Sequence, residues 1–264
     1  MQPQLVWFRQ DLRIRDHHAL SAAMAEGQAI GIYILDDEGP ASHRIGGAQR
    51  WWLHHSLAAL RQSLAELGVP LVLRRGQSAS ELERLVTEAG GAKVHAHHHY
   101  EPWWQAAERE AAQRLDLALH HGNLLANPRA ILNQSGERYR VFTPWFRKLL
   151  EQMPPALPLP VPQPQSAPLA QLASDNLDDW ALLPRNPDWS GGFDAWKPGE
   201  RGARAALREF LPELADYEQA RNFPSQTGTS RLSPHIHFGE ISPASIWHHA
   251  LAKAGAKARS YLSE

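Results

Sequence analysis

The chain has 264 residues, with 27 lysines and arginines against 28 aspartates and glutamates, no cysteine and a net charge of −1. This length suffices for a sizeable core in one large domain or two ordinary ones, and the even charge excludes a global basic field, so any nucleic-acid contact must come from a local patch. The lack of cysteine excludes disulfides, thiolate catalysis and cysteine-bound metal.

Short apolar runs alternate with segments of helical spacing in the first half of the chain. The runs are residues 5–8, 29–35, 71–73 and 93–97. Strands that alternate with helices imply crossover connections, and hence a parallel sheet covered by helices on both faces. The clearest helix spans residues 48–67, where leucines recur every three or four positions until Gly68. We therefore predict a Rossmann-like α/β domain over residues 1–130.

The turn after the first strand carries charged side chains. A dinucleotide-binding domain has a Gly-x-Gly-x-x-Gly turn here, because glycine lets the backbone approach a pyrophosphate. This chain has Arg9, Asp11 and Arg13 instead, which argues against a standard NAD or FAD pyrophosphate site in this half. We interpret the three residues as a salt-bridged network at the carboxyl edge of the sheet, with direct ligand contact as the alternative.

A run of histidines follows the fourth strand. His97 and His99 would lie on one face of an extended chain, but two imidazoles without a clear third ligand make a poor zinc site. We therefore expect solvated or hydrogen-bonded histidines at a strand end, and no metal site.

Prolines crowd together between residues 154 and 168, a density that neither helix nor sheet tolerates. We predict an extended connector laid against the surface, within an interdomain linker over residues 131–195. Residues 196–264 are predicted to be helical. An apolar stripe runs from Ala203 to Tyr217 at intervals of three and four residues, so by spacing Tyr217 is a core residue. Ser242-Pro243 opens a second helix with Ile246, Trp247, Ala250 and Leu251 on one side.

Between these two helices lies a cluster of hydroxyl side chains. Thr229, Ser230 and Ser233 follow Gly228 and precede Pro234, and Arg231 adds a fixed positive charge. This grouping is typical of a helix start, where unpaired N–H groups and the positive end of the helix dipole suit a phosphate. An ordinary capped helix start is the alternative interpretation of the same residues.

Three segments, taken in order, resemble the DNA photolyase and cryptochrome family. They read Trp7-Phe8-Arg9-Gln10-Asp11-Leu12-Arg13, then Tyr217-Glu218-Gln219-Ala220-Arg221-Asn222-Phe223-Pro224, then Thr229-Ser230-Arg231-Leu232-Ser233. Any one of them is a weak signal, whereas three in the family's order are a strong one. The segment Gly46-Gly47-Ala48-Gln49-Arg50-Trp51-Trp52-Leu53 resembles the plant-cryptochrome-like branch, which includes bacterial photolyases for cyclobutane pyrimidine dimers.

The resemblance implies specific roles for matching residues. It implies that FAD is bound by Tyr217, Thr229, Ser230, Arg231, Leu232 and Ser233, where residues 196–264 begin an all-α FAD-binding domain. It also implies that Arg221 meets the DNA backbone. Residues 1–130 would carry an antenna pigment, and Glu101, in its Tyr-Glu context, matches a folate-contacting glutamate. We therefore expect 5,10-methenyltetrahydrofolate, although His97 stands where an asparagine is often found.

The implied activity is that of a deoxyribodipyrimidine photo-lyase, a lyase that uses FAD and blue light to split cyclobutane dimers in UV-damaged DNA. We expect a monomeric, cytoplasmic protein without a membrane contact, since no run approaches the ~20 apolar residues that span a bilayer. In the family, the remaining flavin, electron-relay and lesion-pocket residues follow the point where this sequence stops, so no catalytic residue is expected within it. We interpret the chain as truncated, and as inactive alone. A cryptochrome, a (6-4) photolyase and a bare nucleotide-binding module stay open as alternatives.

Overall fold

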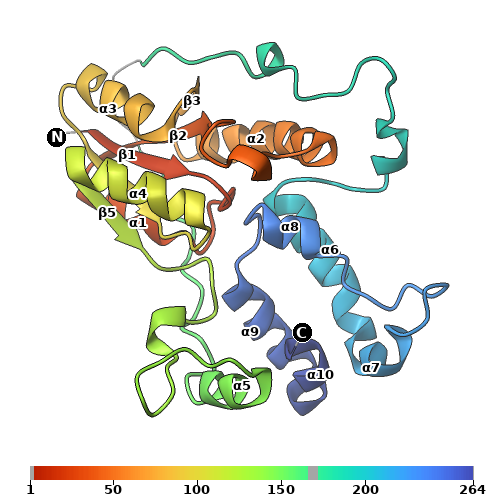
Figure 1. Ribbon diagram of the computed structural model, residues 1–264. Helices are drawn as coiled ribbons and strands as arrows, with labels where there is room; N and C mark the ends of the chain where they lie inside the picture. Colours follow the sequence, from red (N-terminus) through yellow and green to blue (C-terminus); the bar gives the residue numbers. More distant parts are fainter. Residues whose placement is uncertain (1–2, 166–171, 264) are drawn as a thin grey trace.

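In residues 3–165 and 172–263, which the computed structural model describes, five strands form one parallel sheet in the order β3-β2-β1-β4-β5 (Figure 1). The strands are β1 Pro3–Phe8, β2 Gln28–Leu35, β3 Leu71–Arg75, β4 Lys93–His97 and β5 Leu117–His120. The four predicted strands are confirmed. The fifth, β5, was missed because it has only four residues, and a short Leu-Ala-Leu run without β-branched side chains does not distinguish a strand from a helix.

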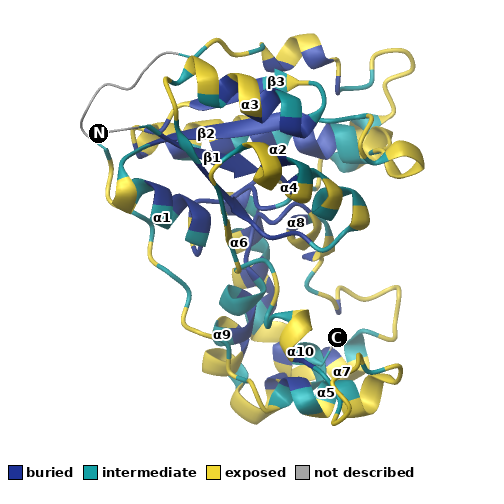
Figure 2. Cartoon of the chain, turned by 60° about the vertical axis from the view of Figure 1, so that its left-hand side comes forward, coloured by how far each residue is buried: buried dark blue, intermediate teal, exposed yellow. Residues whose placement is uncertain are grey.

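Four helices cover the two faces of this sheet. They are α1 His18–Glu26, α2 Gly47–Glu66, α3 Ser78–Glu88 and α4 Pro102–Arg114. Side chains of β1 alternate between the faces: Val6 and Phe8 join the core that includes α1 and α2, whereas Leu5 and Trp7 join the core that includes α3 and α4. Figure 2 shows the buried residues gathered on the strands and on the inward sides of these helices. The predicted α/β fold with helices on both faces is confirmed.

The predicted helix over residues 48–67 is α2. Its leucine stripe is buried throughout, because a leucine every three or four positions follows one face of a helix. The burial anchors α2 to the sheet, and the helix ends where Gly68 takes a φ of +68°.

The proline-rich connector lies along the surface of the sheet domain, as predicted. The backbone N–H of Asp16 donates to Leu159 O at 3.1 Å, and the N–H of Gln165 donates to Leu67 O at 2.8 Å. Pro168, which closes the predicted proline run, lies outside the described residues. Further along the predicted linker, Leu177 and Trp180 are buried in the core on the α1 and α2 side, so this stretch contributes to the sheet domain's packing. The predicted domain boundaries stay a prediction.

The last third of the chain is helical. After α5 Phe142–Leu150, it contains α6 Glu200–Phe210, α7 Tyr217–Ala220, α8 Ser233–His237, α9 Pro243–Ala254 and α10 Arg259–Leu262. The stripe from Ala203 to Tyr217 is buried, but α6 stops at Phe210 and a 3₁₀ segment with Pro212 in its first turn carries the chain to α7. No helix in the described ranges is long and apolar enough to cross a membrane.

The second predicted helix is α9. Its first turn is capped as expected, since Ser245 N donates to the Ser242 hydroxyl at 3.1 Å. Ile246, Trp247 and Ala250 are buried, but Leu251 is exposed. Leu251 lies on the same side of the helix as Trp247, as predicted, and both border an open apolar hollow between α5 and α9.

A backbone junction holds α8 and α9 against the carboxyl edge of the sheet. Leu12 N donates to Phe238 O at 3.0 Å, and Arg13 Nη1 donates to Gly239 O at 3.0 Å. Gly239 has a φ of +63°, and a Cβ there would lie 2.1 Å from Gln10 O. Only glycine permits this approach.

Candidate functional site

Arg9 lies at the carboxyl end of β1 and is 2% exposed. Its Nη1 is 2.7 Å from Glu108 Oε1 on α4, and its guanidinium lies 4.1 Å from the centre of the Trp7 ring. The predicted salt bridge at the sheet edge is therefore confirmed for Arg9. It ties β1 to α4 with a buried cation that the indole face also stabilises.

Arg13 is also buried, but its partners differ from the prediction. Its guanidinium donates to five neutral oxygens: the carbonyls of Arg15, Asp16, Gly122 and Gly239 and the Asn123 side chain. A planar guanidinium carries donors in several directions, so it gathers carbonyls from segments far apart in the chain. Arg13 therefore connects these segments through hydrogen bonds to neutral oxygens, and the predicted salt bridge is not found for it.

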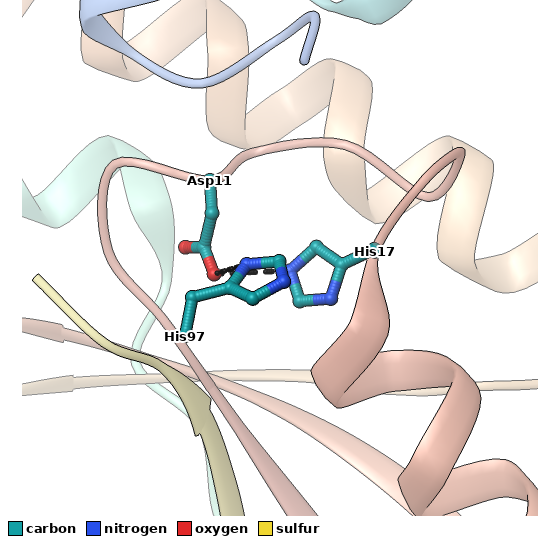
Figure 3. A group of neighbouring side chains, drawn as sticks. All are labelled: Asp11, His17 and His97. Carbon is teal, nitrogen blue, oxygen red and sulfur yellow. Dashed lines mark hydrogen bonds and ion pairs between the residues drawn. The ribbon is translucent and has the colours of Figure 1, made fainter. Parts of the chain in front are cut away.

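Asp11 completes the turn, and its partners are histidines (Figure 3). Its Oδ2 is 3.0 Å from His17 Nε2 and 3.0 Å from His97 Nδ1. The Oδ1 atom accepts a hydrogen bond from Arg9 N at 2.6 Å. The three side chains are fully buried, so Asp11, His17 and His97 form one closed cluster, called the histidine cluster below.

The hydrogen bonds settle the protonation of this cluster. Leu20 N donates to His17 Nδ1 at 3.0 Å, and His18 N donates to His97 Nε2 at 3.2 Å. Each imidazole therefore accepts on one nitrogen and donates to Asp11 from the other, so both are neutral. Burial lowers the pKa of His17 and holds that of His97 well below its usual value. Burial alone would raise the pKa of Asp11, but the hydrogen bonds from the two histidines hold it well below its usual range.

This arrangement changes two expectations about the histidine run. His97 and His99 are hydrogen-bonded, as one alternative held, but they are buried and not solvated. The sequence showed no further candidate metal ligand near His97. In the structure Asp11 and His17 lie beside it, and the potential ligand atoms of the three residues are within 4.8 Å of one another. Every ring nitrogen of His17 and His97 already has a hydrogen-bond partner, which accounts for the cluster as it stands.

A cavity of about 250 Å³, the sheet-edge cavity, opens beside this turn. Its walls come from the ends of β1 and β2, from α2 and α4, and from α8. Polar atoms converge on it, since Gln49 Nε2 lies 3.0 Å from His237 Nε2 and Trp104 Nε1 donates to Gln10 Oε1 at 3.2 Å. The carboxyl end of a parallel sheet is where α/β folds bind ligands.

Glu101, the predicted folate contact, is not part of the wall of the sheet-edge cavity. It is the N-cap residue of α4, its side chain is 39% exposed, and a carboxylate oxygen lies 3.9 Å from His99 Nδ1. The wall instead contains Trp103 and Trp104, which follow Glu101 in α4, and His43, whose ring stacks on Trp103 with centroids 5.1 Å apart.

A second cavity, of about 300 Å³, lies between α6 and the predicted hydroxyl cluster and is called the Thr229 cavity. Thr229, Ser230 and Arg231 line it, and their predicted role in binding FAD stays a prediction. Leu232 does not, because its side chain is 1% exposed within the core formed with α6. Ser233 is exposed and begins α8 outside the cavity wall.

Tyr217 is separated from this cavity by one ring. It is 8% exposed and packs against Phe210 and Tyr261, with ring centroids 5.9 and 5.1 Å apart. The predicted core position of Tyr217 is confirmed, and Phe210 lines the Thr229 cavity. Arg221 lies one turn beyond, with its guanidinium 5.3 Å from the centre of the Tyr217 ring.

Several residues of the Thr229 cavity were not predicted from the sequence. Trp196 and Lys197 line it, and the Arg231 guanidinium lies 4.2 Å from the centre of the Trp196 ring. Tyr261 supports the cavity through a hydrogen bond with Ser230. The Pro-Gly pair that follows Lys197 marks the start of α6 and was the available signal. Nothing in the sequence placed that start beside Thr229.

Comparison with known proteins identifies relatives of the whole chain. The DNA photolyase family model matches residues 4–165. The deoxyribodipyrimidine photo-lyase of Agrobacterium fabrum is 42% identical over 255 residues, which cover 93% of this chain and 52% of that protein. Cryptochrome-1 of Arabidopsis thaliana is 32% identical over 261 residues, which cover 92% of this chain and 37% of that protein.

A solved structure agrees over the full chain. The crystal structure of a bacterial class III photolyase from Agrobacterium tumefaciens superposes with a TM-score of 0.92 at 39% identity, and the match covers 100% of this chain and 56% of that one. The chain therefore spans about half the length of these photolyases.

Proposed function

Because the chain belongs to the DNA photolyase family, we propose that it provides the antenna half and the first flavin contacts of an FAD-dependent enzyme that repairs cyclobutane pyrimidine dimers in DNA under blue light. One observation carries the proposal. Thr229, Ser230, Arg231 and Lys197 all line one cavity beside α6. The family resemblance assigns flavin contacts to these same residues.

The chemistry of the Thr229 cavity suits the diphosphate of FAD. Hydroxyls and cations are the groups that bind phosphate, and here Arg231 and Lys197 supply the charge. Glu209 of α6 and Glu213 of the following 3₁₀ segment also line the cavity, and carboxylates there suit the ribose hydroxyls as acceptors. Arg231 has a φ of +53°, a conformation that is uncommon outside glycine and is found at ligand sites.

The protein's part in the reaction is to bind and orient. Thr229, Ser230 and Arg231 would hold the phosphates through their side chains. The ring of Tyr217 backs the site through Phe210. The flavin, when reduced and excited by light, supplies the electron that splits the dimer. Arg221 meets the DNA backbone and positions the duplex.

The test is a titration of the 264-residue protein with FAD, in which the quenching of flavin fluorescence reports binding. We expect weak, saturable binding, because the Thr229 cavity contacts part of the cofactor. Arg231→Gln should weaken binding about tenfold, the effect of losing one charge-assisted hydrogen bond. Arg201→Gln is the matched control, since Arg201 lies on α6 outside the cavity and pairs with Glu66. Equal loss in both variants, or no binding by the wild type, would contradict the proposal.

Activity requires a second assay, because the relatives are about twice as long as this chain. UV-irradiated DNA is incubated under blue light with the 264-residue protein and with the longest natural form that contains it. We expect dimer loss with the longer form alone, acting as a monomer. Repair by the 264-residue protein would show that these residues suffice.

The sheet-edge cavity is the proposed antenna site. Its aromatic walls and polar Gln10, Gln49 and His237 suit a flat heteroaromatic pigment with hydrogen-bonding edges, and 5,10-methenyltetrahydrofolate has this chemistry. Glu101 lies beyond the cavity wall and would contact the outer part of the pigment. A near-ultraviolet absorption band in the purified protein, lost in Trp103→Ala and kept in Trp189→Ala, tests this proposal.

A cryptochrome is the second candidate function, and one observation favours it: the 32% identity to the Arabidopsis cryptochrome extends over 92% of the chain. A cryptochrome would bind flavin and leave dimers intact, so the repair assay separates the two. The same assay with DNA that contains (6-4) photoproducts distinguishes a (6-4) photolyase from an enzyme that repairs cyclobutane dimers.

A further inference from the structure

A third cavity, of about 400 Å³, lies where the two halves of the chain meet. The turn after β1, the connector near Leu159, α6 and α9 form its walls, and we call it the α6–α9 cavity. The described residues that line it include four arginines: Arg13, Arg15, Arg204 and Arg208. Neither the sequence analysis nor the proposed flavin and antenna sites assign it a role.

Two of these arginines are held together without a counterion. Arg204 and Arg208 are one turn apart on α6, exposed, and directed to the same cavity. Among the described residues neither has an ion-pair or hydrogen-bond partner. Like charges at this spacing destabilise a helix, so the pair is best explained by an anion that joins them. Arg15 adds a third charge, with a side chain that is 50% exposed.

Glu200 pairs with Arg15, but neither carboxylate in the same wall pairs with Arg204 or Arg208. Glu240 is fully buried and accepts from Trp52 Nε1 at 2.9 Å and from Gly199 N at 2.7 Å. Glu200 accepts from Ile14 N at 2.8 Å, and its other oxygen is 3.6 Å from Arg15 Nε. Both carboxylates are occupied by structural partners, which leaves Arg204 and Arg208 as the open cations.

The remaining walls favour a specific kind of anion. The start of α9 adds Ser242 and Ser245, and because Ser242 Oγ donates to Ser245 Oγ at 2.8 Å, the Ser245 hydroxyl hydrogen is free to donate. The first turn of a 12-residue helix also presents the positive end of its dipole. Leu159, Leu207 and Ile241 also line the cavity and add apolar surface beside the polar groups.

We propose that the α6–α9 cavity binds a small organic phosphate ester, with the phosphate between Arg204, Arg208 and Arg15 and the organic part against the apolar surface. The site is distinct from the proposed flavin site. Arg204, Leu207 and Arg208 face it, whereas the opposite side of α6 faces the Thr229 cavity.

The experiment is isothermal titration calorimetry of the 264-residue protein with adenosine monophosphate, and with adenosine as the uncharged probe. We expect adenosine monophosphate to bind in a salt-dependent manner and adenosine to bind at least tenfold more weakly. The double variant Arg204→Gln/Arg208→Gln should lose at least tenfold in affinity. Both side chains are exposed, and circular dichroism melting checks that the variant folds like the wild type.

Two variants separate this site from its neighbours. Arg201→Gln removes the same charge from the same helix outside the cavity and should bind adenosine monophosphate as the wild type does. Arg231→Gln weakens the Thr229 cavity, which could hold the same nucleotide, and the binding that remains in this variant should still be lost when Arg204→Gln/Arg208→Gln is added. The proposal is overturned if the wild type does not bind, if adenosine binds equally well, if the double variant binds unchanged, or if Arg231→Gln alone abolishes binding. Preferred binding of a short DNA strand through the same two arginines would make the surface a nucleic-acid contact and overturn it too.

Discussion

Replacing Asp11 with asparagine tests the histidine cluster. The carboxylate accepts hydrogen bonds from His17, His97 and Arg9 N. Asparagine keeps one acceptor oxygen: with that oxygen at the Oδ2 position its NH₂ group faces Arg9 N–H, and in the reverse orientation the NH₂ group faces both imidazole N–H groups. The imidazoles cannot reverse their tautomers, because their other nitrogens accept from the backbone of Leu20 and His18. The variant therefore leaves a buried donor without an acceptor.

The magnitude follows from the burial of the cluster. Removing one member of a buried charged cluster costs about 3–5 kcal/mol, and the three accepted hydrogen bonds place Asp11→Asn in that range. Urea unfolding at pH 7.5, followed by circular dichroism, measures the loss. Asp178→Asn is the control, because Asp178 has a side chain that is 79% exposed and lies 3.9 Å from His54. We expect that control to change the free energy of unfolding by less than about 0.5 kcal/mol.

The pH dependence has a definite sign. The pKa values of His17 and His97 are lowered by burial in the folded state, so below pH ~6.5 the unfolded state binds more protons and stability falls. Each histidine contributes at most about 1.4 kcal/mol per pH unit there. The pKa of Asp11 is lowered too, so its contribution is lost only below pH ~4. If Asp11→Asn matched the control, or the wild type were more stable at pH 5.5 than at pH 7.5, this reasoning would fail.

Three further substitutions address packing and the junction, each measured by thermal and urea unfolding. Gly239→Ala should destabilise by more than about 2 kcal/mol, because its Cβ would lie 2.1 Å from a carbonyl oxygen, whereas Gly136→Ala, with nothing within 4 Å, should cost about 1 kcal/mol for its positive φ alone. Leu57→Ala in the buried stripe of α2 should cost about 2–5 kcal/mol, while Leu157→Ala, at a side chain 77% exposed, should change little. Glu240→Gln should cost about 1.5–3 kcal/mol, because the buried carboxylate accepts two N–H groups and faces an imidazole; an unchanged unfolding midpoint would contradict that role.

The parts of the fold that follow from local patterns could be predicted from the sequence. The leucine stripe of α2 and the apolar run of β2 each carry one period along the chain, so they were found within a residue or two. The strand β5 was not found, because its short run of Leu117, Ala118 and Leu119 has no β-branched residue and directly follows a helix, so periodicity alone cannot distinguish it from helix. The end of α6 was missed for another reason: the spacing of buried residues continues through Pro212, while the backbone changes to a 3₁₀ segment.

The candidate sites depended more on contacts between distant segments. Thr229 and Arg231 stood out as a hydroxyl and cation cluster, but Lys197 of the same cavity lies more than 30 residues away in the chain and had no local signal. The histidine cluster is a similar case. Asp11 and His97 were each singled out in the sequence. Their contact could not be predicted, because it depends on β1 pairing with β4 in the sheet, which brings the ends of these two strands together.

The turn after β1 contacts both the histidine cluster and the C-terminal half of the chain, and this should affect the kinetics of amide hydrogen exchange. Its Asp11 side chain is fixed by the histidine cluster, and the next residue, Leu12, donates its N–H to Phe238 in the C-terminal half. Opening of the cluster therefore releases the anchoring turn of α8 and α9 together with it. Amide hydrogens of the two regions, although more than 200 residues apart in the chain, should exchange with solvent as one cooperative unit.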